Sequence, residues 1–204
     1  MKEVLYMDKI ECQEKYETQT KELYAAIGKF TVKFEHVCHA MSNTILWALQ
    51  SDGLRTQRLA NAVLTGLTAD PLRKIFGSVL AEVRHDDEQD KEIVKNVLKR
   101  VQELTESRNN VIHRTWFVGW VSLEDSDFSV VPSWKFVNTT EGTEFRSLSY
   151  SATDFDELSA KADELADIIN RMCCCLTIDC RFTNNFNVDP DKTVRRVPKL
   201  GVTT

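Results

Sequence analysis

Four polar residues within a six-residue segment carry the most chemical information in this sequence. Arg108, Asn109, Asn110 and His113 lie in the run RNNVIH, which combines one permanent cation, two amides and one imidazole. A guanidinium can hold a phosphate in a bidentate fork and stabilise the charge that a transition state gains. An imidazole can take a proton from a ribose 2′-hydroxyl or deliver one to a leaving oxygen. These groups together can cleave a phosphodiester without a metal ion.

Arg108 also breaks the hydrophobic pattern of the segment in which it lies. Apolar residues recur at helical spacing through a helix predicted over about residues 89–113. The row consists of Val94, Val97, Val101, Leu104, position 108 and Val111. A guanidinium in an inward-facing row is costly unless an anion pairs with it, and sequences tend to break a local rule at functional sites. Position 108 is therefore a candidate site on pattern grounds alone.

Helical spacing places these side chains around the C-terminal end of the predicted helix. Arg108 and His113 are five residues apart, which in an ideal helix means about 140° of rotation and about 7.5 Å of rise. They would not form a tight pair, but they can flank one phosphate group where the helix ends. Asn110 and His113 share a face, and Glu106 lies one turn before Asn110 on that face. Asn110 and Glu106 are therefore candidate supporting residues.

The elements that must position this segment are predicted to be mostly helices. Only 7 Gly and 4 Pro are present, which favours long helices. Apolar residues spaced by three and four predict helices over about 21–49, 56–67, 70–83, 89–113 and 153–176, the third opening with Asp70 as its N-cap. Residues 115–151 are instead rich in aromatic and β-branched residues separated by polar turns. They predict an antiparallel sheet of two or three strands, with Pro132 at an edge or bulge.

The predicted fold is mainly α. It is an antiparallel bundle of about five helices, with a small antiparallel β-sheet inserted at about 115–151, before the last helix. A single helical domain is predicted over residues 1–183. From residue 184 the chain is polar and irregular, which predicts a flexible C-terminal tail over 184–204. The basic residues of this tail can contact RNA or simply solvate a flexible end, and the sequence does not decide between the two: Lys192, Arg195, Arg196 and Lys199.

Composition excludes several classes of protein. Hydrophobic residues make up 42% and charged residues 28% of the chain, so a core can form. No run approaches the roughly 18 apolar residues of a membrane span, and the charged N-terminus lacks the apolar centre of a secretory signal. A cytoplasmic protein without a membrane partner is therefore expected. The net charge of −5 argues against a broadly basic coat for nucleic acid, although a local basic cluster remains compatible with it.

Cysteine and histidine placement predicts neither disulfides nor a metal site. Cys173, Cys174 and Cys175 are consecutive in a helical pattern and point in different directions, so free thiols are expected. A redox or metal cluster is the alternative to plain packing there. His36 and His39 can share a metal beside Cys38, but no second ligand pair at a recognisable spacing accompanies them. Glycine-rich phosphate loops and serine-nucleophile elbows are missing too, so no cofactor is expected.

The segment RNNVIH resembles the Arg-x4-6-His signature of the HEPN superfamily, with four intervening residues and Asn directly after Arg. The order of elements over about residues 20–180 resembles that family as well. The resemblance implies a metal-independent endoribonuclease that acts as a homodimer, with two motifs meeting across a two-fold axis. It implies His113 as catalytic base or acid, Arg108 as the phosphate-binding residue and Asn109 as the supporting polar residue. Some family members add an acidic residue from an earlier helix, for which Glu35 is the candidate.

The same resemblance suggests a biological setting and one departure from it. Many family members belong to toxin–antitoxin or antiviral defence systems, so an antitoxin or regulatory protein is a candidate partner beside the RNA substrate. Some of these toxins carry a tyrosine that is modified two residues after the histidine. Thr115 occupies that place here, which puts control by tyrosine nucleotidylation in doubt.

Two alternatives remain open at this level. The chain can be a non-catalytic HEPN-like module that binds RNA, a nucleotide or a partner protein without cleaving. The tryptophans of the predicted insertion, Trp116, Trp120 and Trp134, can stack on bases. The more economical expectation is that they fill the junction between the sheet and the helices.

Overall fold

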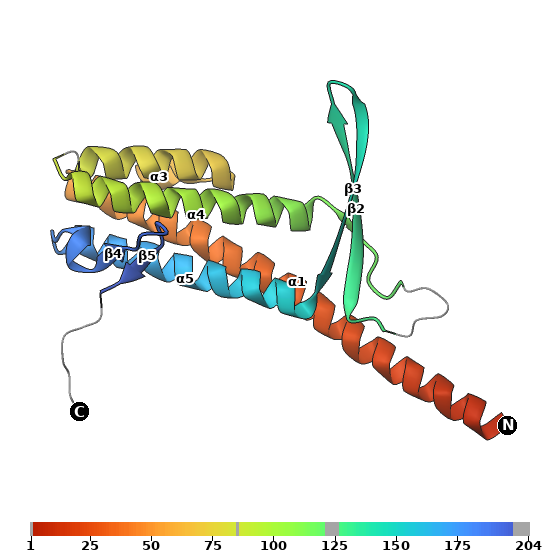
Figure 1. The fold of residues 1–204 in the computed structure, drawn as a ribbon. Helices are drawn as coiled ribbons and strands as arrows, with labels where there is room; N and C mark the ends of the chain where they lie inside the picture. Colours follow the sequence, from red (N-terminus) through yellow and green to blue (C-terminus); the bar gives the residue numbers. More distant parts are fainter. Residues whose placement is uncertain (1, 85, 121–126, 198–204) are drawn as a thin grey trace, which may run out of the picture. The chain divides into compact units, whose positions relative to one another are not determined.

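The computed structural model describes residues 2–84, 86–120 and 127–197, with side chains from residue 11 onward (Figure 1). The chain divides into two compact units. The sheet unit comprises residues 1–33 and 107–160, and the bundle unit comprises residues 34–106 and 161–204. Three of the helices run from one unit into the other, since α1, α4 and α5 each cross a unit boundary in the sequence.

The described residues form five α-helices and two small antiparallel sheets. The helices are α1 (Lys2–Ser51), α2 (Gln57–Leu64), α3 (Ala69–Val83), α4 (Glu88–Ile112) and α5 (Ala152–Thr177). The strands are β1 (Thr115–Trp116), β2 (Val130–Thr139), β3 (Gly142–Ser151), β4 (Phe186–Val188) and β5 (Val194–Arg196). The predicted fold class is confirmed, with a three-stranded antiparallel sheet before the last helix. No helix in the described ranges is long and apolar enough to cross a bilayer.

The core of the bundle unit is built from the apolar rows that the sequence predicted. Phe34, Val37, Met41 and Ile45 of α1 are all at most 1% exposed. The other helices contribute further buried residues, among them Phe76, Leu80, Val97, Val101, Leu165, Ile169 and Met172. Burying side chains of this size contributes about 1.5–3 kcal/mol each relative to leaving them in water. The spacing of these residues along each helix is therefore sufficient reason for the helices to pack together within this unit.

The starts of α1 and α3 and one detail of the sheet differ from the prediction. Helix α1 begins at Lys2 and not at about residue 21. Helix α3 begins at Ala69 with Thr68 as its N-cap, so Asp70 lies inside the first turn, where it pairs with Arg73 and Lys74. Pro132 was expected at an edge or bulge, but it lies in the central strand β2, in unbroken register opposite Ser149 of β3. The position tolerates proline because β1 pairs with β2 only as far as Ser133.

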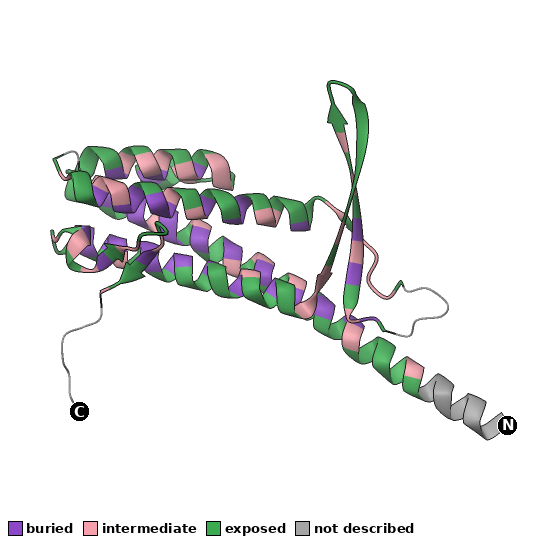
Figure 2. Cartoon of the chain, viewed as in Figure 1, coloured by how far each residue is buried: buried purple, intermediate pink, exposed green. Residues whose placement is uncertain are grey.

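The sheet of the sheet unit has the order β1-β2-β3, with ten residue pairs between β2 and β3. Its inner side at the base of the hairpin buries Val131 and Ser133. Farther along, both strands become exposed, which Figure 2 shows as green on the outer half of the hairpin. The segment before β2 is anchored by Phe128, whose ring meets Tyr16 of α1 edge-on at 5.2 Å. Gly119 is required nearby, because its φ is +82° and a Cβ there would lie 2.7 Å from the Tyr16 ring.

The passage from β3 to α5 is direct and is closed by a capping box. Ser151 ends the strand and Ala152 begins the helix. The backbone N–H and the hydroxyl of Ser151 each lie 2.7 Å from the Asp154 carboxylate, and the Asp154 N–H lies 3.3 Å from the Ser151 hydroxyl oxygen. This reciprocal pair satisfies backbone donors that the start of a helix leaves open. These hydrogen bonds lower the pKa of Asp154 below its ordinary value of 3.8.

The predicted flexible tail from residue 184 is wrong for the part of it that the structure describes. Residues 182–184 form a 3-10 turn, and β4 and β5 form a two-stranded sheet that buries Phe186 and Val194. The fully buried Asp90 carboxylate accepts backbone N–H groups from Phe182 and Thr183 at 3.0 and 3.1 Å. Buried apolar residues that lie far apart in the sequence stabilise this segment, together with the distant carboxylate of Asp90. Neither feature leaves a periodic pattern in the sequence.

Three of the four basic residues of the predicted tail therefore lie in a folded segment. Arg195 and Arg196 lie in β5 and pair with Asp189 and Asp167. Lys192 occupies the turn between the strands, with a φ of +65°. Lys199 lies outside the described residues.

Candidate functional site

The RNNVIH segment forms the last turn and the end of α4. Every apolar member of the predicted row from Val94 to Val111 is buried, at 5% exposure or less. Arg108 takes the remaining position of that row, half-buried, with its Nε atom removed from solvent. The prediction that position 108 lies on the inward row of α4 is therefore confirmed. Burial of part of the guanidinium limits its motion, which makes it a better-defined phosphate ligand than a freely exposed arginine.

The other three motif residues are exposed beside it. Asn109 and Asn110 point to solvent, and the Asn109 side-chain oxygen accepts a hydrogen bond from Arg108 Nη1 at 3.4 Å. His113 directly follows the last residue of α4, and its backbone N–H still donates to the Asn109 carbonyl at 3.1 Å. Its imidazole is exposed but its backbone is held to the helix. The negative end of the helix dipole lies here and favours positive charge.

Two residues just after the motif fix the position of this helix end. The indole Nε1 of Trp116 donates to the Val111 carbonyl at 2.6 Å, which satisfies an acceptor in the last turn of α4. The Trp116 ring packs against Phe155 and Tyr150 at centroid distances of 5.3 and 5.7 Å. Arg114 Nη1 donates to the Arg146 carbonyl of β3 at 3.1 Å. The motif is thus tied to the sheet on the side where the chain leaves the helix.

Sequence reasoning missed these two as positioning residues. Trp116 was correctly expected to fill the junction with the sheet, but its hydrogen bond back to α4 was not. The signal in the sequence was the position of Trp116, since a tryptophan four residues after a helix end can reach the last open carbonyls. Arg114 left no comparable signal, because its acceptor is a backbone carbonyl of a strand 32 residues away.

The two acidic residues predicted to support the motif are Glu106 and Glu35, and both belong to the bundle unit. Glu106 is exposed one turn before Asn110 on α4, and it accepts a hydrogen bond from Gln102 at 3.1 Å. Glu35 is an exposed residue of α1 that belongs to the bundle unit, whereas the motif begins the second segment of the sheet unit. Within the sheet unit, the arginine, the two asparagines and the histidine lie at one helix end. The supporting roles of Glu106 and Glu35 stay predictions.

The residues considered for metal binding or redox chemistry have ordinary surroundings. His36 and His39 are exposed on α1, and within the described ranges no group of three or more His, Cys, Asp or Glu is arranged to hold a metal. All six cysteines are free thiols. Cys173 and Cys175 are buried in the row of α5, and burial raises the pKa of both, that of Cys175 to about 12. Thiols that resist ionisation fit a packing role and are poor nucleophiles or metal ligands.

The tryptophans of the insertion divide into two groups. Trp116 fills the junction, as expected, but Trp120 and Trp134 are 68% and 46% exposed. The expectation that all three fill the junction is therefore wrong for these two. Each lies within 5 Å of the ring centre of Phe117, so they belong to one exposed aromatic group rather than to the core.

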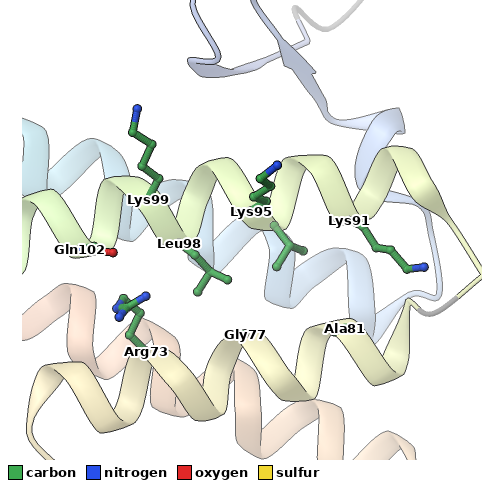
Figure 3. A pocket seen from close by; sticks show the side chains of 9 residues that line it. Arg73, Gly77, Ala81, Lys91, Lys95, Leu98, Lys99 and Gln102 are labelled. Atoms are coloured by element: carbon green, nitrogen blue, oxygen red, sulfur yellow. The ribbon is translucent and has the colours of Figure 1, made fainter.

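A groove of about 440 Å³ lies between α3 and α4 in the bundle unit (Figure 3). Gly77 and Leu98 are among its apolar lining residues, and Arg73 of α3 extends toward α4. Its cations already have carboxylate partners on their own helices, for example Arg73 with Asp70 and Lys91 with Glu88. Charge at this groove is therefore locally balanced, and it contains no imidazole or thiol.

The motif at the end of α4 is the arrangement with the clearest chemistry in the described part of the chain. It offers a constrained cation, an exposed imidazole and two exposed amides on one helix end. No family model matches this sequence, and comparisons with curated proteins and with solved structures found no match either. A functional assignment therefore depends on the residues and their geometry.

Proposed function

We propose that this chain is a metal-independent endoribonuclease of the HEPN type, with its active site at the RNNVIH segment. The observation that carries the proposal is Arg108, which stands half-buried in an otherwise fully buried apolar row, beside the exposed His113. The guanidinium departs from the apolar pattern of its own row, and sequences tend to break a local rule at functional sites. Binding an RNA phosphate is the use that fits a constrained guanidinium next to an imidazole and two amides.

The proposed reaction is an internal transfer within the RNA. The ribose 2′-oxygen forms a bond to the adjacent phosphorus, the bond from phosphorus to the 5′-oxygen breaks, and a 2′,3′-cyclic phosphate results. The 2′-hydroxyl proton is removed, and one proton is delivered to the leaving 5′-oxygen. His113 performs one of these transfers. Arg108 stabilises the charge on the phosphate oxygens, and Asn109 supports Arg108 through its side-chain oxygen.

Two proton transfers and one imidazole per motif favour a site formed by two chains. We propose a homodimer in which two RNNVIH segments meet, so that one His113 acts as base and the other as acid. Activity per chain should then fall as the protein is diluted through the dimer dissociation constant. A constant activity per chain over a dilution that produces monomers, followed by light scattering, would contradict the shared site.

The decisive experiment is RNA cleavage in EDTA by the wild type, Arg108→Ala and His113→Ala. Loss of either residue should reduce the rate by about 10²–10⁴-fold, the usual contribution of a positioned acid, base or charge-stabilising group. His39→Ala is the matched control, since it removes an equally exposed histidine from α1 and should cut like the wild type. Cleavage by His113→Ala at the wild-type rate would refute the mechanism. Products that carry a 2′,3′-cyclic phosphate would identify the attacking group.

The second candidate is a module that binds RNA without cutting it. The exposure of Trp120 and Trp134 favours this alternative, since exposed rings are binding groups and contribute nothing to proton transfer. It predicts RNA retention with no change of RNA length over time. In either case a defence or toxin–antitoxin setting, with a regulatory protein as further partner, is the biological context that we propose.

A further inference from the structure

Five aromatic rings form a connected group on one side of the sheet unit, here named the aromatic face. Its members are Phe117, Trp120, Trp134, Phe136 and Phe145. Ring centres lie 4.9 Å apart for Phe117 and Trp120, 4.4 Å for Phe117 and Trp134, 5.9 Å for Trp134 and Phe145, and 5.5 Å for Phe136 and Phe145. Phe136 and Phe145 are 69% and 52% exposed. Phe117 is half-buried, and the other four rings are exposed. A group of exposed rings on a small sheet is uncommon and marks a binding surface.

Strand register places these rings together and separates them from the buried side. Phe136 stands directly opposite Phe145, and Trp134 opposite Ser147, so these residues share one side of the hairpin. The neighbouring positions point the other way, where Lys135 stands opposite Arg146. Near the base of the hairpin that other side is the one that buries Ser133. The aromatic face is therefore the outward side of the sheet within its own unit.

The composition of this side favours a nucleic acid over a protein partner. Between the rings stand hydroxyl and amide side chains, namely Thr115, Asn138, Thr143, Ser147 and Ser149. No carboxylate shares this side of β2 and β3, in a chain that has 31 acidic residues. Glu144, on the reverse side, is held by Arg146 at 2.9 Å. A phosphate backbone is repelled by carboxylates, while hydroxyls and amides can bond to base edges and riboses.

The rings of the group are not stacked flat on one another. Neighbouring rings in the group are inclined to one another by 52° to 64°, and none is stacked parallel on the next. Aromatic side chains of this kind accept unpaired bases, because every base has a flat face, whereas the bases of a duplex are already stacked on each other. The ring faces thus suit single strands.

The aromatic face and the proposed active site belong to the same unit. His113 is followed by Arg114 and then by Thr115, the first residue of β1. Arg114 donates to the carbonyl of Arg146 in β3, and Trp116 donates to that of Val111 in α4. Thr115 stands opposite Trp134, so only Arg114 separates His113 in the sequence from a position on the aromatic side of the sheet.

We propose that the aromatic face binds the unpaired bases of single-stranded RNA and thereby selects single strands as the substrate. This inference rests on the proposed function for the choice of RNA. The rings bind bases in a sequence-tolerant way, and the residues of the RNNVIH segment act on the phosphodiester. Duplex RNA, whose bases are stacked on each other, is excluded from the face.

The test uses full-length protein carrying His113→Ala, so that RNA remains intact during binding. Two probes are compared. One is a single-stranded RNA of about 12 nucleotides, a length within the usual site sizes of single-strand-binding domains, and the other is a duplex of the same sequence. Binding of the single strand should quench tryptophan fluorescence and the duplex should not. Adding Trp134→Ala or Phe136→Ala should weaken binding by about 5- to 150-fold per ring. Leu59→Ala on α2 is the matched control, because it removes an equally exposed apolar side chain elsewhere and should change nothing.

Each result separates this inference from the proposed nuclease. If ring variants bind the single strand as tightly as the His113→Ala parent, or the parent binds no single strand, the inference is wrong. If light scattering shows that ring variants lose self-association instead of RNA binding, the face is an interface between two copies and the inference is equally wrong. If single strands bind through the rings but His113 makes no difference to RNA length, the inference holds and the nuclease proposal fails.

Discussion

The two hairpins of this protein use aromatic residues in opposite ways. The short hairpin β4–β5 in the bundle unit has strands of three residues and a fully buried Phe186. The long hairpin β2–β3 in the sheet unit has strands of ten residues and leaves Phe136 and Phe145 in solvent. A hairpin of three-residue strands cannot stand without anchoring side chains. The long hairpin β2–β3 has more pairs between its strands, and it leaves these two rings exposed instead of burying them. Burial therefore serves stability in one hairpin, and exposure serves recognition in the other.

The same contrast divides the two ends of α4. The portion in the bundle unit is apolar and buried on its inward row, whereas the end in the sheet unit places Arg108 on that row. One helix thus changes from a structural to a chemical role within two turns. A functional residue on a structural row should be replaceable without harm to folding but not without harm to activity.

The largest effect should come from Arg108→Leu, which completes the apolar row. RNA cleavage is expected to fall by about 10²–10⁴-fold, because the phosphate loses its charge partner. The thermal midpoint should change less than it does for a core truncation such as Val101→Ala, since leucine fits an inward position. Cleavage assays and thermal unfolding of the same protein preparations measure the change in activity and the change in stability. A variant that unfolds as readily as Val101→Ala would show that Arg108 is structural.

Next in size is the contrast between Phe186→Ala and Phe136→Ala. Phe186 is 1% exposed, so its truncation should destabilise the protein by about 3–5 kcal/mol. Phe136 is 69% exposed, and its truncation should change stability by no more than about 0.5 kcal/mol. Urea unfolding of the two variants beside the wild type measures the difference. Equal destabilisation by both would mean that the aromatic face is part of a packed core.

The sequence predicted a region well where the residues that determine its structure lie close together in the chain. The helices from residue 21 onward, the sheet before α5 and the placement of Arg108 on an inward row were correctly predicted, because periodicity is a local property. The part of α1 before residue 21 was not predicted. The fold of residues 182–196 was not, because it depends on Asp90, which accepts backbone N–H groups more than ninety residues away in the chain. The exposure of Trp120 and Trp134 was not predicted either. Alternation shows which residues share a side of a strand, but it does not show which side is covered.

The catalytic roles assigned to the residues of the RNNVIH segment stay predictions. The sequence identified Arg108, Asn109, Asn110 and His113, and the structure places them on one helix end. It could not identify the contacts that hold that end, because Trp116 and Arg114 act through backbone carbonyls. Carbonyl acceptors are present at every residue, so no pattern of residue types distinguishes the ones that are used.

The smallest effect concerns two carboxylates, one in each unit, whose pKa is lowered for different reasons. The pKa of Asp154 in the sheet unit is lowered first by the Ser151 backbone N–H, and that of Asp70 in the bundle unit first by Lys74 and then by Arg73. In both cases the folded pKa lies below the unfolded one. The stability that each contributes is therefore complete above the ordinary value of 3.8 and is lost as the pH falls below it through the folded pKa.

Salt separates the two contributions, because ions screen exposed charge pairs more than they weaken a hydrogen bond to the backbone. Replacing Asp154 with Asn should remove part of the stability change below pH 4, by less than about 1 kcal/mol, and 1 M salt should leave that difference in place. Replacing Asp70 with Asn should have an effect only at low salt. Urea midpoints for both variants across pH 2–6, at low and high salt, measure this. An Asp154 effect that disappears in salt would mean that charge attraction, and not the capping box, joins β3 to α5.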